Sequence, residues 1–178
     1  MKFFNVFILC CGRCGSLTFS MACSHINNYT SGHETKTGVI GKDRIFYKNN
    51  HIEIDNRLCW FLNRIDNCYN NNPFYVHLIR NKEDCVRSLK KGPRRIILAY
   101  AEILQRNKGS AEELSFDYYD LINENISKFL ENKTNKMIFK LENAKNDFIK
   151  FWNNIKAEGD LDKSLNEWDV KYNETIKK

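Results

Sequence analysis

The sequence predicts an α/β fold with a small parallel sheet flanked by helices. Two short runs, 3–10 and 74–79, are almost continuously apolar, which is typical of central parallel strands covered on both faces. Segments with helical spacing of apolar residues alternate with these runs, as strand–helix–strand units require. The chain has 178 residues, enough for a sizeable core, so we expect residues 1–178 to form a single domain.

The first strand leads through a glycine-containing turn into a helix. We expect the strand over 3–10 and the helix over 16–26. The inward stripe of that helix is expected to hold Leu17, Met21 and Ala22. The asparagine-rich stretch 27–32 has the composition of a loop.

The next segment has a weaker pattern. We expect a short strand over 44–48, and then a helix with Asp55 as its N-cap. The apolar residues of this helix recur at helical spacing, and they are Leu58, Phe61, Leu62 and Ile65. The helix should end at the break 70–73, which is rich in asparagine and contains a proline.

In the second half of the chain, expected strands and helices alternate more clearly. The strand over 74–79 is followed by Asn81, which we expect to cap a helix whose first turn carries Glu83 and Asp84, because acidic groups suit a helix N-terminus. Gly92 and Pro93 should end that helix. The remaining expected elements are helices over 96–107, 116–131 and 144–155, a strand over 137–141, and a last helix capped by Asp160.

Composition and charge narrow the function classes. The net charge of +6 suits an anionic ligand but is spread too thinly to indicate nucleic acid. No stretch approaches the ~18 apolar residues of a membrane helix, and the N-terminal apolar run has no signal-peptide cleavage pattern. We therefore expect a cytoplasmic protein with neither a membrane nor a nucleic-acid partner, and the oligomeric state stays open.

The cysteines are seven in number. Cys11 and Cys14 form a C-x-x-C pair, but no second pair completes a zinc site. We interpret all seven as reduced thiols, as the cytosol favours, and we expect no metal. A zinc or redox role for Cys11 and Cys14 is the alternative.

The turn after the first strand carries the first candidate site. Its residues 12–16 read Gly-Arg-Cys-Gly-Ser. Backbone N–H groups and the dipole at a helix N-terminus favour a phosphate group, and Arg13 adds a bidentate guanidinium. The lysine of a Walker A loop is missing. The alternative is an ordinary turn with a solvated arginine.

The second candidate site follows the strand over 74–79. Arg80 stands at the end of the strand, and Ser88 lies eight residues later on the expected helix. A guanidinium and a hydroxyl in these places can converge on one phosphate. The alternative is an Arg80 paired with Asp84 and a solvent-facing Ser88.

Taken together, the basic-x-Gly-Ser turn and the Arg80/Ser88 segment resemble the two donor-binding segments of sulfotransferases that use 3′-phosphoadenosine 5′-phosphosulfate (PAPS). The resemblance implies a P-loop NTPase-like three-layer sandwich and transfer of a sulfuryl group without a metal. It implies that Arg80 and Ser88 hold the 3′-phosphate. It places the 5′-phosphosulfate on Arg13, Cys14, Gly15, Ser16, Leu17 and Thr18. The chain is shorter than typical members, and Leu17 stands where threonine is frequent.

Sulfuryl transfer needs a base that takes the proton of the acceptor hydroxyl. Family bases are usually His or Glu, so Glu34 is the first candidate and His33 the second, against the alternative of an ordinary polar loop. Glu53 and Asp55 are weaker candidates on a stretch that we expect to be a loop facing the acceptor. We interpret the basic run 90–95 as a solvated face, with a contact to an anionic glycan or to adenine as the alternative; its cations are Lys90, Lys91, Arg94 and Arg95.

The resemblance leaves the acceptor open, as a carbohydrate, another small molecule or a protein. Two other functions stay in view. One is a small P-loop nucleotide or nucleoside kinase, which the missing Walker A lysine disfavours. The other is a non-catalytic descendant that still binds nucleotide.

Overall fold

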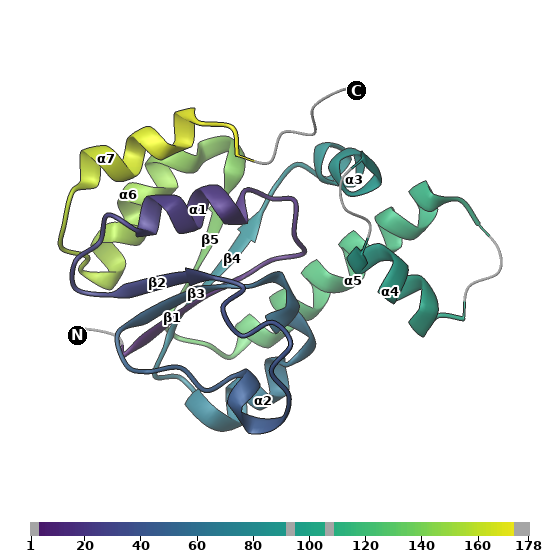
Figure 1. Ribbon diagram of the computed structural model, residues 1–178, viewed down its shortest axis with the longest axis horizontal. Helices are drawn as coiled ribbons and strands as arrows, with labels where there is room; N and C mark the ends of the chain where they lie inside the picture. The colour runs from purple at the N-terminus through teal and green to yellow at the C-terminus, as the bar shows by residue number, and fades with distance from the viewer. Residues whose placement is uncertain (1–3, 92–94, 106–108, 173–178) are drawn as a thin grey trace.

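The computed structural model describes residues 4–91, 95–105 and 109–172. Within these ranges, one all-parallel sheet has the strand order β2-β3-β1-β4-β5 (Figure 1). The strands are β1 (Asn5–Leu9), β2 (Thr30–His33), β3 (His51–Ile54), β4 (Phe74–Ile79) and β5 (Lys136–Lys140). The α/β fold class expected from the sequence is confirmed.

Helices cover both faces of the sheet and make a three-layer sandwich. One face carries α1 (Ser16–Cys23), α6 (Ala144–Ile155) and α7 (Leu161–Asn166). The other face carries α2 (Leu62–Tyr69), α3 (Lys82–Lys91) and α5 (Ala111–Glu131). Short 3₁₀ segments are η1 (Gly41–Arg44), η2 (Asn56–Trp60), η3 (Leu141–Asn143) and η4 (Glu167–Asp169).

The central strand β1 is buried along its whole length. Successive side chains of a strand point to opposite faces, so β1 supplies both cores. Val6 and Ile8 pack under α1 and α6, while Phe7 and Leu9 pack under α2 and α5. This arrangement explains why the sequence of β1 is apolar without alternation.

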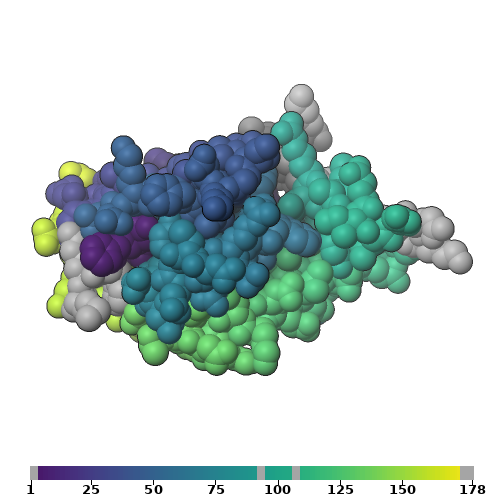
Figure 2. All heavy atoms as spheres, turned by 90° about the horizontal axis from the view of Figure 1, so that it is seen from below, coloured from purple at the N-terminus to yellow at the C-terminus, as the bar shows by residue number. Residues whose placement is uncertain are grey.

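The remaining helix of the described ranges, α4 (Arg95–Ile103), packs against α5 and lies to one side of the sheet (Figure 1). In the space-filling view its teal segment protrudes from the rest of the molecule (Figure 2). Its buried side chains are Ile97 and Tyr100. Across the described ranges, none of the helices is both long enough and apolar enough to span a membrane.

Two of the strands, β2 and β3, were not expected from the sequence. Thr30–His33, in part assigned to a loop, forms the edge strand β2, and His51–Ile54 forms β3. The strand expected over 44–48 is wrong, because a 3₁₀ helix ends there at Arg44. Neither β2 nor β3 has an apolar pattern strong enough to show in the sequence, and both are held by backbone pairing with their neighbours.

Helix α1 also differs from expectation. It ends at Cys23, and Met21 is exposed instead of facing inward. Its buried side chains are Phe19, Ala22 and Cys23. Phe19 makes ring contacts with Phe139 and Phe151, so the aromatic core beneath α1 sets its rotation.

Other expectations are confirmed. The strand over 74–79 and the helix over 144–155 have the expected bounds. The side chains of Asp55, Asn81 and Asp160 accept N–H bonds at the starts of η2, α3 and α7. The expected helix end at Gly92 and Pro93 lies outside the described residues. The end expected for the next helix at residue 107 is wrong, because α4 already ends at Ile103 and Gln105 has a left-handed φ of 47°.

Further expected bounds shift, and the strand expected over 3–10 is shorter, since β1 spans Asn5–Leu9. Helix α5 begins at Ala111 rather than 116, because Ser110 and Glu113 form a capping box there. The strand over 137–141 is found one residue earlier, as β5. The helix after Asp55 is divided into η2 and α2.

Candidate functional site

The candidate site lies at the carboxyl edge of the sheet, between the loops that follow β1 and β4. From β1 the chain crosses through α1 to β2 on one side, and from β4 it crosses through α3–α5 to β5 on the other. Loops that leave neighbouring strands in opposite directions open a crevice in which α/β proteins bind ligands. β1 and β4 are hydrogen-bonded neighbours, so both loops start from adjacent positions.

The loop after β1 is built from left-handed residues. Gly12 and Gly15 have φ values of 86° and 89°, and Arg13 has φ 56°. Glycine adopts this region without strain. A Cβ on Gly15 would lie 2.6 Å from Leu141 Cδ1, and one on Gly12 would lie 2.8 Å from Asn56 Nδ2. The loop therefore needs glycine both for its turn and for its close packing.

Gly15 is the N-cap of α1 and has no side chain with which to cap it. The N–H groups of the first helical turn are left for another partner, which is the condition for anion binding at a helix start. Ser16, Leu17 and Thr18 form this turn and are half-buried. The resemblance assigns these residues to the 5′-phosphosulfate.

The three side chains expected to hold phosphate groups are brought together. Arg13 Nε donates to Ser88 Oγ at 3.0 Å, across a separation of 75 residues. Arg80 Nη1 donates to the carbonyl oxygen of Arg13 at 3.2 Å. Tyr119 of α5 donates to the carbonyl oxygen of Arg80 at 2.8 Å and fixes the end of β4. Both motifs thus meet in one place.

The candidate bases lie on the other side of the loop. Ser16 Oγ is 3.1 Å from His33 Nε2, so the last residue of β2 reaches the start of α1. The Glu34 carboxylate forms an ion pair with Arg57 Nη1 at 2.6 Å. Glu34 has φ 54° and donates its backbone N–H to Ile54. His33 and Glu34 are close to the loop, but the two side chains have different partners.

Glu53 is not on a loop and does not face an acceptor. It lies in β3 with a fully buried side chain. Its carboxylate accepts from Thr35 N at 2.8 Å, Thr35 Oγ1 at 2.6 Å and His51 Nε2 at 2.9 Å. A buried carboxylate must have such partners, and these bonds hold the turn after β2 against β3.

Asp55 is also buried and fully engaged. It accepts from Arg44 Nη2 at 2.5 Å and from the backbone N–H of Arg57 at 2.8 Å. Burial raises the pKa of Asp55, and the Arg57 N–H and the Arg44 guanidinium oppose that rise. It positions Arg57 beside Glu34 and is not available to an acceptor.

Cys14 has no exposed side chain. Hydrogen bonding with Cys10 and Cys11, together with burial, raises the pKa of its thiol. Any contact with the donor nucleotide would have to come from its backbone. The cysteine side chain instead anchors the loop in the core beneath α1.

The basic run after α3 is only partly described. Lys90 pairs with Glu112 of α5 at 2.8 Å, and Lys91 is exposed at the end of α3. Arg94 lies outside the described residues, and Arg95 begins α4. The Lys90 pair fits the solvated-face interpretation.

Three residues near the site were missed by sequence reasoning. Asn56 packs against Gly12, Arg57 holds Glu34, and Glu142 Oε1 accepts from the backbone N–H of Asn81 at 2.6 Å. The first two follow β3, which was itself missed. Recognition of β3 would have placed them at the carboxyl edge.

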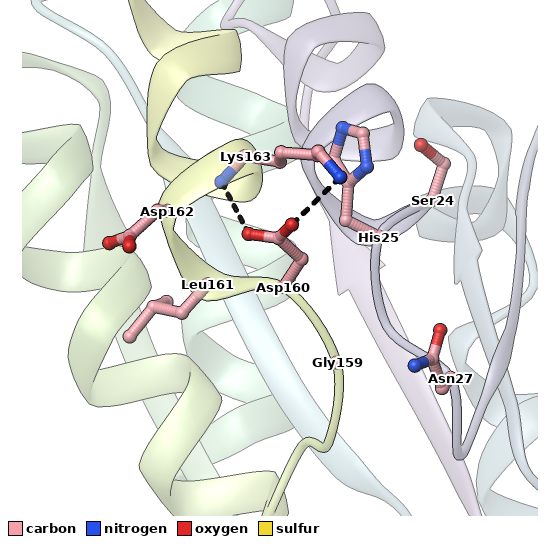
Figure 3. A pocket seen from close by; sticks show the side chains of 8 residues that line it. All are labelled: Ser24, His25, Asn27, Gly159, Asp160, Leu161, Asp162 and Lys163. Atoms are coloured by element: carbon pink, nitrogen blue, oxygen red, sulfur yellow. Dashed lines mark hydrogen bonds and ion pairs between the residues drawn. The ribbon is translucent and has the colours of Figure 1, made fainter.

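A separate open hollow of about 670 Å³ lies at the other end of α1 (Figure 3). It is lined by Ser24, His25, Asn27, Gly159, Asp160, Leu161, Asp162 and Lys163. Of its charged groups, Lys163 and Asp160 form an ion pair at 2.9 Å, while His25 bonds to Glu167 outside the lining. Within the described ranges, no group of three or more His, Cys, Asp or Glu side chains is arranged to hold a metal ion.

No protein-family model matches the chain, and no curated protein is recognisably similar to it.

Proposed function

We propose that the chain is a PAPS-dependent sulfotransferase. The observation that supports this most is the meeting of Arg13, Arg80 and Ser88 at the carboxyl edge between β1 and β4. These residues belong to two sequence segments that resemble the donor-binding segments of that family. If the resemblance of two short motifs were due to chance, the fold would have no reason to bring these residues into contact.

A phosphate group suits these side chains chemically. A phosphate oxygen only accepts hydrogen bonds, whereas a guanidinium only donates and a hydroxyl can donate. Ser88 now accepts from Arg13. A 3′-phosphate placed between them would accept from both, and bonds of this charge-assisted kind are the stronger ones.

The contacts favour His33 over Glu34 as the base. The Glu34 carboxylate already forms an ion pair with Arg57 Nη1 at 2.6 Å, so an acceptor hydroxyl would have to compete with that cation for it. His33 Nε2 already lies within hydrogen-bond distance of a hydroxyl at the start of α1. The same nitrogen would take the proton of an acceptor hydroxyl, whose oxygen attacks the sulfur. The bond from sulfur to the 5′-phosphate oxygen then breaks and 3′-phosphoadenosine 5′-phosphate leaves.

Ligand-dependent thermal stability tests this proposal. The full chain is heated with 3′-phosphoadenosine 5′-phosphate, with 5′-AMP, and with ATP and Mg²⁺. We expect the bisphosphate to raise the melting temperature most, since 5′-AMP lacks the 3′-phosphate. Arg80→Ala should abolish the shift. Arg87→Ala is the matched control, because Arg87 lies on the same helix as Ser88 but pairs with Asp84 at the surface.

The other outcomes separate the alternatives. A larger shift with ATP and Mg²⁺ would favour a kinase. Stabilisation by the bisphosphate without transfer of labelled sulfate from PAPS to any of a panel of hydroxyl compounds would favour a non-catalytic binder. No shift with any of the nucleotides would contradict all three functions.

A further inference from the structure

Two buried thiols meet directly beneath the loop after β1. Cys11 Sγ and Cys85 Sγ are 3.6 Å apart, although 74 residues separate them in the sequence. Both side chains are at most 1% exposed. Each sulfur also lies 3.4 Å from the carbonyl oxygen of Gly12, to which its S–H can donate. The pair therefore joins the loop after β1 to the first turn of α3.

The cysteines around this pair belong to both cores of the protein. Cys11 and Cys85 belong to the core beneath α2 and α5. Cys10 and Cys14 belong to the core beneath α1 and α6. Cys59 shares the core of Cys11, but its thiol donates to the carbonyl oxygen of Asn56 at 2.8 Å. Within its own core, Cys11 therefore has Cys85 as its contacting cysteine, and it also hydrogen-bonds Cys14 of the other core.

The two thiols are not equivalent. Hydrogen bonds from the Cys14 and Cys85 thiols lower the pKa of Cys11, against the opposing effect of burial. Hydrogen bonding to Cys11 and burial raise the pKa of Cys85. Because the thiolate is the reactive form, Cys11 is the group that reacts first with an oxidant.

We propose that Cys11 and Cys85 are a modification site, at which a hydroperoxide converts the two thiols into an intramolecular disulfide. The Cys11 thiolate attacks hydrogen peroxide, the O–O bond breaks, and a sulfenic acid and hydroxide form. The Cys85 sulfur then attacks the Cys11 sulfur and expels the second oxygen as water. In total, two thiols and one peroxide give one disulfide and two water molecules.

The sulfurs have only a short distance to move. A disulfide bond is about 2.05 Å long, so the 3.6 Å separation must shrink by roughly 1.5 Å. A small oxidant is required, because both thiols are buried and a local opening must admit it. The product would replace both S–H donors to the Gly12 carbonyl with a covalent tie between the loop and α3. Ser88 lies one turn beyond Cys85 on that helix. This inference does not depend on the identity of the ligand.

Peptide mapping of the full chain tests the proposal. Cys68 is the exposed cysteine among the described residues, so Cys68→Ser is used as the background to prevent links between chains. The protein is treated with hydrogen peroxide, alkylated under denaturing conditions and digested with trypsin. We expect peptides 3–13 and 83–87 to be linked through Cys11 and Cys85, with loss of both thiols in equal amounts. Dithiothreitol should restore both peptides.

Other results would overturn the proposal. They are a Cys85 that remains fully alkylated after peroxide treatment, or a Cys11 that is bonded to Cys10 or Cys14. Adding Cys85→Ser to the background should leave Cys11 as a sulfenic or higher acid with no linked peptide. If that variant fails to fold, the map of the background protein decides alone.

Discussion

The two ends of helix α1 differ in how they use polar groups. At its carboxyl end, the open hollow of about 670 Å³ (Figure 3) contains an ion pair between Lys163 and Asp160. At its amino end, side chains from the loops after β1, β2, β3 and β4 converge around a helix start that has no side-chain cap. We therefore place the proposed ligand site at the amino end of α1, where these side chains converge, and not in the open hollow.

Glycine also has a different task at each end. A Cβ on Gly159 would lie 2.1 Å from the backbone oxygen of His25, in the antiparallel bridge between Ile26 and Gly159. A Cβ on Gly15 would meet the side chain of Leu141. The carboxyl end therefore needs glycine for a close approach of two backbones. The amino end needs it for the left-handed N-cap that presents N–H groups.

The largest expected effect is a loss of stability from a substitution at the carboxyl end of α1. Gly159→Ala should lower the free energy of unfolding by about 3 kcal/mol or more, because backbone and not a side chain must move. Gly38→Ala is the matched control: it has φ 85° but nothing within 4 Å of its Cβ, so only the left-handed strain of ~1–2 kcal/mol applies. Urea unfolding measures both. Equal losses in the two variants would contradict the close-approach argument.

The next effect concerns the amino end. Arg80→Ala should weaken binding of 3′-phosphoadenosine 5′-phosphate by ~10- to 100-fold, the loss of a charge-assisted bond of ~1.5–3 kcal/mol. Lys163→Ala, which removes a cation from the hollow, should leave the affinity unchanged. Isothermal titration measures both. The comparison fails if Lys163→Ala weakens binding as much as Arg80→Ala.

A smaller effect is expected for the hydroxyl. Ser88→Ala removes one neutral donor and should weaken bisphosphate binding by ~3- to 10-fold, or ~0.5–1.5 kcal/mol. Binding of 5′-AMP should not change, because Ser88 is assigned to the 3′-phosphate. Ser24→Ala in the hollow is the control. If Ser88→Ala affects both nucleotides equally, the assignment to the 3′-phosphate is wrong.

The acid dependence of stability should give the smallest effect, at the carboxyl end. Hydrogen bonds from Tyr172 and His25 lower the pKa of Glu167 below its ordinary value of 4.5. The resulting stabilisation is present above that ordinary value and is lost as the pH falls through the lowered folded-state pKa. Glu167→Gln should therefore lose less stability than the parent protein between about pH 5 and pH 3. If the free energy of unfolding falls equally with pH in Glu167→Gln and in the parent protein, Glu167 is not linked to acid stability.

Local chemistry made part of the fold predictable. The strand over 74–79 is apolar and ends at a capping Asn81, and the helix over 144–155 has a strong apolar face. β2 and β3 were missed because they are held by backbone pairing, of β3 with β1 and of β2 with β3, and not by an apolar pattern of their own. The polar Glu53 looked like a loop residue, since its partners Thr35 and His51 are visible only in three dimensions.

The candidate site likewise contains residues that local sequence indicates and residues that only the fold brings into place. Arg13, Arg80 and Ser88 were predictable because each stands at a strand end or a helix turn that the sequence defines. Arg57 was not predictable, because its place beside Glu34 depends on β3. The Cys11–Cys85 contact joins two segments that no local pattern connects.

The most direct test of the central claim is hydrogen exchange of the full chain with and without 3′-phosphoadenosine 5′-phosphate. Because the proposed site lies at the amino end of α1, we predict slower exchange in residues 12–18 and 80–88 when the bisphosphate is bound. Exchange in the hollow, at residues 24–27 and 159–163, should not change. Protection of the hollow without protection of residues 12–18 would contradict the account.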